Sequence, residues 1–285
     1  MCLLVLAWNV HPRYRLVLAA NRDEFHDRPA APLGWWLDMK GIVAGRDLRG
    51  SGTWMGAARS GRFGVVTNFR DLEPPPTPDA PSRGELVPQF LAASTSPERY
   101  LDELHGRAAR YAGFNLLVGD AGVLHYYSNR NGVTSTQLAP GVYGLSNHLL
   151  DSPWPKLVRT RERLGALSRH DALDPDRLFE LLDDRMPADD DQIVGTGLPP
   201  DWERALSAPF VVHGRYGTRC STLLFIEHGG GVSMHERRFD AAGRQTGATR
   251  WQFEAEAARD RRVESGYEDA TEPNALHEKF DTPTE

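Results

Sequence analysis

Residues 2–24 have the sequence CLLVLAWNVHPRYRLVLAANRDE. Two apolar runs, 2–8 and 15–20, are separated by a polar turn around His11-Pro12-Arg13. Apolar runs of this length with a turn between them predict two largely buried strands paired as a hairpin. We therefore expect the core to begin with this hairpin and Asn21-Arg22-Asp23-Glu24 to follow its second strand.

Cys2 opens the first run and becomes the N-terminal residue if Met1 is removed. An N-terminal cysteine carries a thiol with a pKa of about 8.5 and an α-amine with a pKa of about 7.7–8.0. The amine can therefore accept the thiol proton near neutral pH, which activates the sulfur as a nucleophile. The alternative is a buried cysteine that only fills the core, as most free cysteines do. Position alone favours that alternative.

The rest of the chain indicates more strands around two helical inserts. Further strands are predicted at 41–44, 52–58, 62–68, 114–118, 123–128, 134–138, 142–145, 221–228, 232–239 and 249–253, and helices at 83–93, 97–110, 155–168 and 175–184. Strands first, helices in the middle and strands last favour an α+β layered domain over alternating βαβ units. We expect one domain over 1–254 and a disordered acidic tail over 255–285.

Charge and composition narrow the class of protein. The formal net charge is −6, and residues 254–285 alone carry ten acidic and four basic side chains. The body is therefore close to neutral, without the basic stripe that nucleic-acid binding needs. Two cysteines and no long apolar segment predict a cytoplasmic protein without a membrane span, and thirty arginines against three lysines suggest a bacterial genome. The oligomeric state stays open.

The strong phosphate and metal motifs are absent from the sequence. It contains no Walker loop, no HExxH and no CxxC pair, so we expect no metal site. Gly50-Ser51-Gly52 has the wrong spacing for a dinucleotide fingerprint and is more simply part of a hairpin. Gly229-Gly230-Gly231 likewise indicates a turn.

Several segments together carry a family resemblance. They are MCLLVLAW, LAANRDEF, GTWMGA, GVVTNFRD, GFNLLVGD, GLSNHLLDSPWPK and GTRCSTLL, which run from Met1 to about residue 253. In these segments the chain resembles the NRDE family, whose animal members are the transport-and-Golgi-organisation proteins. That family in turn resembles N-terminal-nucleophile hydrolases of the bile-salt hydrolase and penicillin V acylase type. The resemblance implies a four-layer αββα sandwich with largely antiparallel sheets.

The resemblance also implies a set of site residues. Matched position by position, they are Cys2 as nucleophile, with Arg22, Asp23, Asn68, Asn147 and Arg219 around it. Arg22 and Asp23 adjoin here, whereas the hydrolases usually separate their Arg and Asp by two residues. Glu24 has no counterpart among the hydrolases.

Each of these residue types suits acyl chemistry. Asp23 can hold the α-amine near the sulfur, and Arg22 and Arg219 can lower the thiol pKa. The Asn147 side-chain amide and a backbone N–H near Asn68 can form an oxyanion hole. The alternatives are ordinary: both asparagines as turn residues, Arg219 paired with an exposed carboxylate, and the neighbouring Cys220 as a buried thiol.

Two functions follow from the resemblance. The first is an amide or acyl hydrolase, or an acyltransferase, that uses Cys2 after Met1 removal and needs no cofactor. The second is a non-catalytic protein that binds and moves haem, lipid or acyl-coenzyme A in the same cleft. Tryptophans that can line such a cleft are Trp8, Trp35, Trp36 and Trp54, although core packing is their commoner use. A purely structural domain leaves the charged residues beside Cys2 unexplained.

Overall fold

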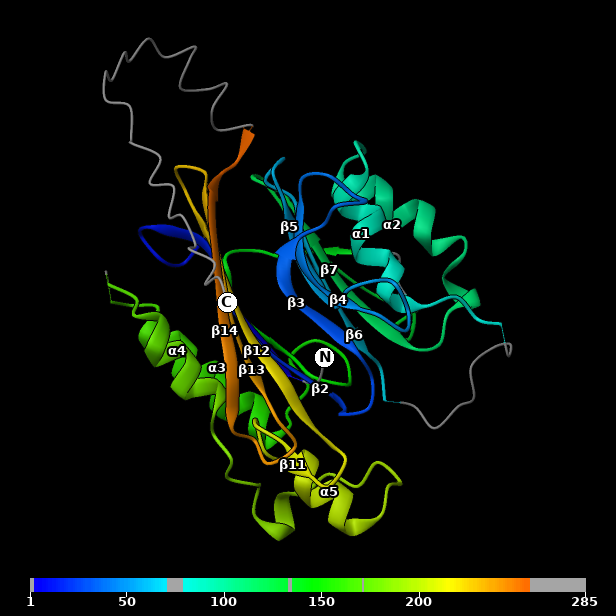
Figure 1. Ribbon diagram of the computed structural model, residues 1–285, viewed down its shortest axis with the longest axis vertical. Coiled ribbons are helices and arrows are strands. Elements are labelled where there is room, and N and C mark those ends of the chain that lie inside the picture. Colours follow the sequence, from blue (N-terminus) through cyan, green and yellow to red (C-terminus); the bar gives the residue numbers. More distant parts are fainter. Residues whose placement is uncertain (1–2, 71–78, 133–134, 171, 257–285) are drawn as a thin grey trace, which may run out of the picture.

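Two antiparallel sheets face each other in the computed structural model, which describes residues 3–70, 79–132, 135–170 and 172–256 (Figure 1). The first sheet has the order β10 (Gly141–Leu145), β1 (Leu3–Trp8), β2 (Tyr14–Phe25), β12 (Tyr216–Glu227), β13 (Gly231–Phe239) and β14 (Gln245–Glu254), with β11 (Val212–His213) paired to β12. The second has the order β3 (Ala30–Trp35), β4 (Ile42–Asp47), β5 (Met55–Ala58), β6 (Phe63–Asn68), β7 (Phe114–Gly119), β8 (Leu124–Ser128) and β9 (Thr136–Gln137).

Helices cover the outer faces of both sheets (Figure 1). The described helices are α1 (Leu86–Ala92), α2 (Pro97–His105), α3 (Pro155–Leu167), α4 (Pro175–Leu182) and α5 (Pro200–Leu206), with 3₁₀ turns η1 (Arg83–Glu85), η2 (Ala108–Arg110) and η3 (Asp190–Gln192). The helix α5 lies beside β11 at one end of the molecule (Figure 1). The helices α1 and α2 pack on the second sheet, and α3 and α4 pack on the first.

Alternation along each strand explains the four layers. In β1, Leu4 and Leu6 enter the core between the sheets, whereas Leu3 and Val5 pack in the cluster that includes α3 and α4. Because both faces of the strand are covered, both sets of positions are apolar and the run is continuous. The predicted α+β class and the αββα order of layers are confirmed.

The predicted hairpin is confirmed, but its second strand is longer than expected. The strand β1 pairs with β2 from Leu3 opposite Asn21 to Trp8 opposite Leu16. On its other side β2 pairs with β12 as far as Phe25. The NRDE motif therefore lies inside a central strand and not in a turn after it, because β12 supplies backbone partners that extend the ladder beyond the apolar run.

Other boundaries also differ from the prediction. The strand β12 begins at Tyr216, so Arg219 lies within it and does not precede it. The predicted helix 83–93 is a 3₁₀ turn followed by α1, because the ring of Pro88 is tolerated only in the first turn of an α-helix. The predicted helix 97–110 ends at His105, and a 3₁₀ turn follows Gly106.

Short or weakly apolar elements were not predicted at all. These are β3, β11 and α5, whose sequences are interrupted by proline or polar residues. The hairpin around Gly50-Ser51-Gly52 joins β4 to β5 as predicted, and Gly229-Gly230-Gly231 turns β12 into β13. Of the predicted tail, Ala255 and Glu256 are described and hydrogen-bond to Gly230 and Arg59, and the remainder lies outside the described residues.

Candidate functional site

The side chains of the NRDE motif point alternately toward the helical layer and toward the space between the two sheets. Successive residues of a strand point to opposite faces of the sheet. Asn21 is fully buried toward the helices, where its Nδ2 donates to the carbonyl oxygens of Leu182 at 2.8 Å and Pro209 at 2.9 Å. Its Oδ1 accepts a hydrogen bond of 2.6 Å from the Ser221 hydroxyl. Asn21 therefore fixes the helical layer to the sheet.

Asp23 lies on the same face as Asn21. Its carboxylate accepts a hydrogen bond of 2.6 Å from the Thr218 hydroxyl, and that hydroxyl accepts one of 2.9 Å from the Val211 backbone N–H. Arg22 and Asp23 are adjacent in sequence but are separated by the thickness of the sheet.

Arg22 points into the space between the two sheets. Its guanidinium lies over the Trp54 ring at 4.4 Å from the centroid, and Nη2 is 3.7 Å from an Asp47 carboxylate oxygen. Its Nη1 is buried and has no hydrogen-bond partner among the described residues. Trp54 in turn packs on Gly45, where an added Cβ would lie 2.4 Å from the ring. The Trp54 ring thus packs against the Arg22 guanidinium, and the absence of a side chain at Gly45 leaves space for that ring.

Arg22 lines a polar pocket of about 540 Å³, counting its open mouth. The other lining residues are Glu24, Arg28, Asp47, Thr53, Trp54, Val66, Asn68, Ser82, Arg83 and Gly84. Three arginines face two carboxylates in this lining, so the pocket favours an electron-rich or anionic ligand group.

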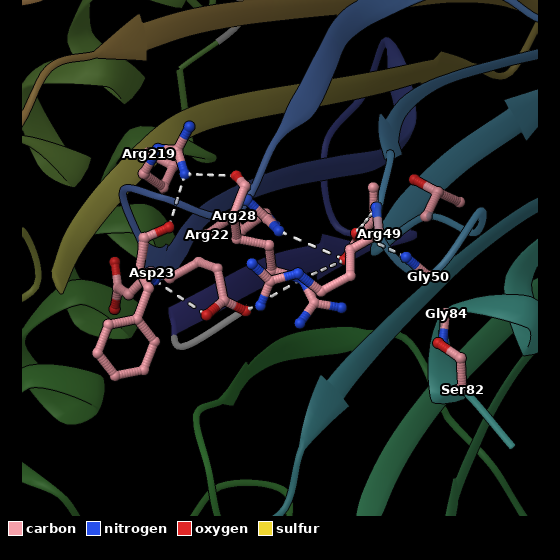
Figure 2. Close-up of polar contacts among 12 residues, drawn as sticks. Arg22, Asp23, Arg28, Arg49, Gly50, Ser82, Gly84 and Arg219 are labelled. Carbon is pink, nitrogen blue, oxygen red and sulfur yellow. Dashed lines mark hydrogen bonds and ion pairs between the residues drawn. The ribbon is translucent and has the colours of Figure 1, made fainter. Parts of the chain in front are cut away.

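Asp47 connects two of the arginines. Its carboxylate lies 2.7 Å from Arg28 Nε, and Figure 2 shows Arg22 and Arg28 pointing toward the same group. Burial alone would raise the pKa of Asp47, but hydrogen bonds from the Gly50 N–H and from Arg28 outweigh it and hold that pKa below its ordinary value. Asp47 is therefore charged and keeps both arginines at the pocket.

The structure brings Asn68 and Asn147 together. Asn68 ends β6 and is exposed, while Asn147 follows β10 and is buried. The Asn147 Nδ2 donates to the Asn68 carbonyl oxygen at 3.0 Å, and the Arg70 N–H donates to the Asn147 carbonyl oxygen at 2.6 Å. Asn147 thus contacts the backbone of Asn68, which lines the pocket, but Asn147 is not itself among the lining residues.

Arg219 occupies a β-bulge, where β12 carries one more residue than β2 between Thr218 and Cys220. Its Nη1 donates to the carbonyl oxygens of Phe25 at 2.8 Å and Arg28 at 2.9 Å (Figure 2). Burial and the nearby charge of Arg22 lower its pKa. Arg219 does not line the pocket. It holds the connection that presents Arg28.

Cys220 is a buried thiol, as predicted. It is 4% exposed, and burial together with the nearby carboxyl of Glu236 raises its pKa to about 12. A thiol with so high a pKa is inert at neutral pH.

Several pocket residues were missed by the sequence prediction. Glu24 shares a face with Arg22 because β2 continues through Phe25 by pairing with β12, and the sequence pattern does not indicate that continuation. The other missed residues lie in three separate places: Arg28 between β2 and β3, Asp47 at the end of β4, and Arg83 in η1. No local sequence pattern marks any of them as a pocket residue. They reach the pocket only through the packing of one sheet on the other.

The remaining predicted residues divide as follows. Cys2 lies outside the described residues. Trp54 lines the pocket, Trp8 packs in the core between the sheets, and Trp35 and Trp36 line a separate surface hollow. Within the described part of the chain, no cluster of three His, Cys, Asp or Glu side chains is placed to hold a metal ion. No described helix has the length and apolar character needed to cross a bilayer.

Comparison with known proteins places the chain in a family. The model of the family "Transport and Golgi organisation 2" matches residues 1–241. The mouse homologue is 33% identical over 257 residues, covering 83% of this chain and 92% of that protein. The human homologue is 34% identical over 259 residues, with the same coverage.

A solved structure is also similar. It is the Caenorhabditis elegans orthologue of N-acylethanolamine-hydrolyzing acid amidase, with a TM-score of 0.47 and 10% identity, covering 78% of this chain and 92% of that one. A likeness of this size decides neither the fold nor the chemistry of the present chain. The family match and the homologues are sufficient by themselves: this chain belongs to the Transport and Golgi organisation 2 family.

Proposed function

We propose that the protein is an amide or acyl hydrolase, or an acyltransferase, whose nucleophile is Cys2 after removal of Met1. The observation that carries the proposal is the buried Arg22 Nη1, which has no partner among the described residues and lines the polar pocket. An unpaired buried guanidinium N–H is costly unless a ligand or a neighbouring thiolate completes it.

The register of the first hairpin supports the nucleophile. Leu3 pairs with Asn21, one residue before Arg22. Leu3 is the first described residue of β1, so this end of β1 lies beside the residue that precedes Arg22 in β2.

The proposed reaction has two steps. The α-amine accepts the Cys2 proton, and the sulfur attacks the substrate carbonyl carbon. The bond from the carbonyl carbon to the nitrogen, sulfur or oxygen atom of the leaving group then breaks, and the leaving group takes the proton from the ammonium. Water, or an acceptor amine or thiol, attacks the resulting thioester and regenerates the Cys2 thiol. The Asn147 amide is the side-chain donor proposed for the oxyanion.

Hydrolysis of p-nitrophenyl hexanoate and of hexanoyl-p-nitroanilide tests this function. We expect Cys2→Ala to abolish turnover and Asn147→Ala to reduce it about 10²–10³-fold. Cys220→Ala is the matched control, because it removes the other thiol of the chain, and it should retain turnover. Equal activity of Cys2→Ala and wild type contradicts the proposal, as does activity in a chain that keeps Met1.

A second candidate is a protein that holds a ligand without turning it over. It is favoured by the hydrogen bond from Asn147 Nδ2 to the Asn68 carbonyl oxygen. Because that bond uses one of the two N–H groups of the amide, only one is left for an oxyanion. The described pocket lining contains no His, Cys, Met or Tyr that could ligate haem iron, so its arginines would hold haem through carboxylates. Haem titration of wild type and Arg28→Gln tests this: an unshifted Soret band together with acyl hydrolysis rejects it.

A further inference from the structure

A second pocket begins two residues beyond Asn68. Asn68 lines the first pocket and Arg70 lines the second, which has a volume of about 340 Å³ counting its mouth. An extended chain advances about 3.3 Å per residue, so the two positions are close neighbours. The second pocket is walled by Trp154, Pro155 and Leu206, together with Ile193 and Val194.

Two cationic side chains, Arg70 and Lys156, line this pocket. Lys156 is 2% exposed, and its Nζ donates to the Leu206 carbonyl oxygen at 2.7 Å. Arg70 lies over the Trp154 ring at 5.4 Å from the centroid, and its other contacts are long: 3.5 Å from Nη2 to Asn147 Oδ1 and 3.8 Å from Nη1 to Glu203 Oε2.

Glu203 is the one carboxylate among the described lining residues, and one of its oxygens already accepts hydrogen bonds from a neighbouring segment. Its Oε1 accepts hydrogen bonds from the Thr196 N–H, the Thr196 hydroxyl and the Leu198 N–H. Burial would raise the pKa of Glu203, but these hydrogen bonds and the charge of Arg70 outweigh it and lower that pKa. Glu203 therefore orders the 196–198 segment, and its oxygen nearest Arg70 makes only the long 3.8 Å contact.

We infer that this pocket binds an amphipathic anion, with its carboxylate or phosphate group at Arg70 and its apolar segment along Trp154 and Ile193. A guanidinium with only long contacts can form a bidentate pair with an oxyanion at little cost in existing bonds. The apolar walls account for the rest of the ligand. This site does not require Cys2, and it stands whether or not the chain has hydrolytic activity.

Arg70 also links this pocket to the first one. Its backbone N–H and its Nη2 both contact Asn147, whose amide donates to the carbonyl oxygen of the pocket residue Asn68. A ligand that draws the guanidinium into the second pocket therefore acts on the same asparagine. In this arrangement Arg70 is a positioning residue for Asn147 as well as the anion-binding group.

Calorimetric titration with octanoate, octyl phosphate and the neutral isostere octanamide tests the inference on the Cys2→Ala protein. This background separates binding from turnover. We expect at least one of the two anions to bind about tenfold or more tightly than octanamide, since charge-assisted hydrogen bonds are the stronger class. The preferred anion distinguishes a carboxylate from a phosphate ligand. Failure of both anions to bind, or equal binding of octanamide, overturns the site.

Variants of arginine then locate the site. Arg70→Gln should weaken binding of the preferred anion about tenfold or more. Arg99→Gln is the matched control, because Arg99 is an exposed arginine paired only with Glu103, and it should bind as the parent does. Unchanged affinity in folded Arg70→Gln contradicts the inference. The comparison of octanoate and octyl phosphate with octanamide decides the question without a variant if Arg70→Gln does not fold.

Discussion

The four residues of the NRDE motif have two different roles, one in stabilising the fold and one in forming the pocket. Asn21 and Asp23 face the helices and hold the segments around Leu182 and Val211. Arg22 and Glu24 face the other sheet and line the pocket. Two residues of the motif therefore stabilise the fold and the other two line the pocket. The alternation of side chains along the strand determines which role each residue has.

Asn21→Ala should destabilise the fold strongly. The substitution leaves the carbonyl oxygens of Leu182 and Pro209 and the Ser221 hydroxyl without their partner in a fully buried place. We expect the free energy of unfolding to fall by about 3 kcal/mol in urea titrations. Gln137→Ala, at an exposed position of β9, should change it by less than about 0.5 kcal/mol. Equal effects of the two would show that the Asn21 hydrogen bonds contribute little.

The sequence indicates these residues but not their directions. Periodicity ends at Ala20, so the sequence alone predicts that the strand stops there and the charges follow in a turn. Only the pairing with β12 shows that the alternation continues through Phe25. For the same reason the sequence groups Arg22 with Asp23, whereas the strand groups Arg22 with Glu24.

At the scale of elements, Gly45 of β4, Trp54 just before β5 and Arg22 of β2 form a stack between the two sheets. Gly45→Ala should cost about 1–3 kcal/mol of unfolding free energy, because the added Cβ meets the Trp54 ring. Gly34→Ala on the adjacent strand β3 is the matched control, since the nearest atom to its added Cβ is 3.9 Å away. Thermal and urea unfolding of both variants measure the difference. A neutral Gly45→Ala would mean that Trp54, and with it Arg22, is loosely held.

The edge strand β3 is tied to the opposite sheet by polar contacts. The Leu33 N–H donates to Glu236 Oε1 at 3.0 Å, and the Leu33 carbonyl oxygen accepts from Trp251 Nε1 at 3.2 Å. Burial raises the pKa of Glu236 above its ordinary value, and this outweighs the Leu33 hydrogen bond and the charge of Arg238. The folded chain therefore keeps the Glu236 proton to a higher pH than the unfolded chain does.

This pKa gives a pH-dependent prediction with a definite sign. Between the two pKa values the folded state binds more protons, so the contribution of Glu236 to stability falls as pH rises. Glu236→Gln lacks this loss, and its stability relative to wild type should increase from about pH 4 to pH 7. Urea unfolding across that range measures it. Glu162→Gln, at an exposed position, should show no such trend, and a flat difference for Glu236→Gln would contradict the raised pKa.

For the whole molecule, the sequence predicts the layers better than the site. Continuous apolar runs such as Leu3–Trp8 indicate strands buried on both faces, and the family resemblance implies the αββα order of the layers. The pocket, by contrast, forms where β2 of one sheet faces β4, β6 and η1 of the other. Residues far apart in sequence, such as Arg28 and Arg83, meet there, and no local pattern encodes that meeting.

The central claim is that Cys2 is an N-terminal nucleophile beside the pocket of Arg22. Intact-mass measurement after exposure to p-nitrophenyl hexanoate tests it most directly. The account predicts one hexanoyl group on a chain lacking Met1, present in Cys220→Ala and absent in Cys2→Ala. A chain that is acylated with Met1 in place, an adduct that persists in Cys2→Ala, or a wild-type chain that takes up no hexanoyl group would contradict it.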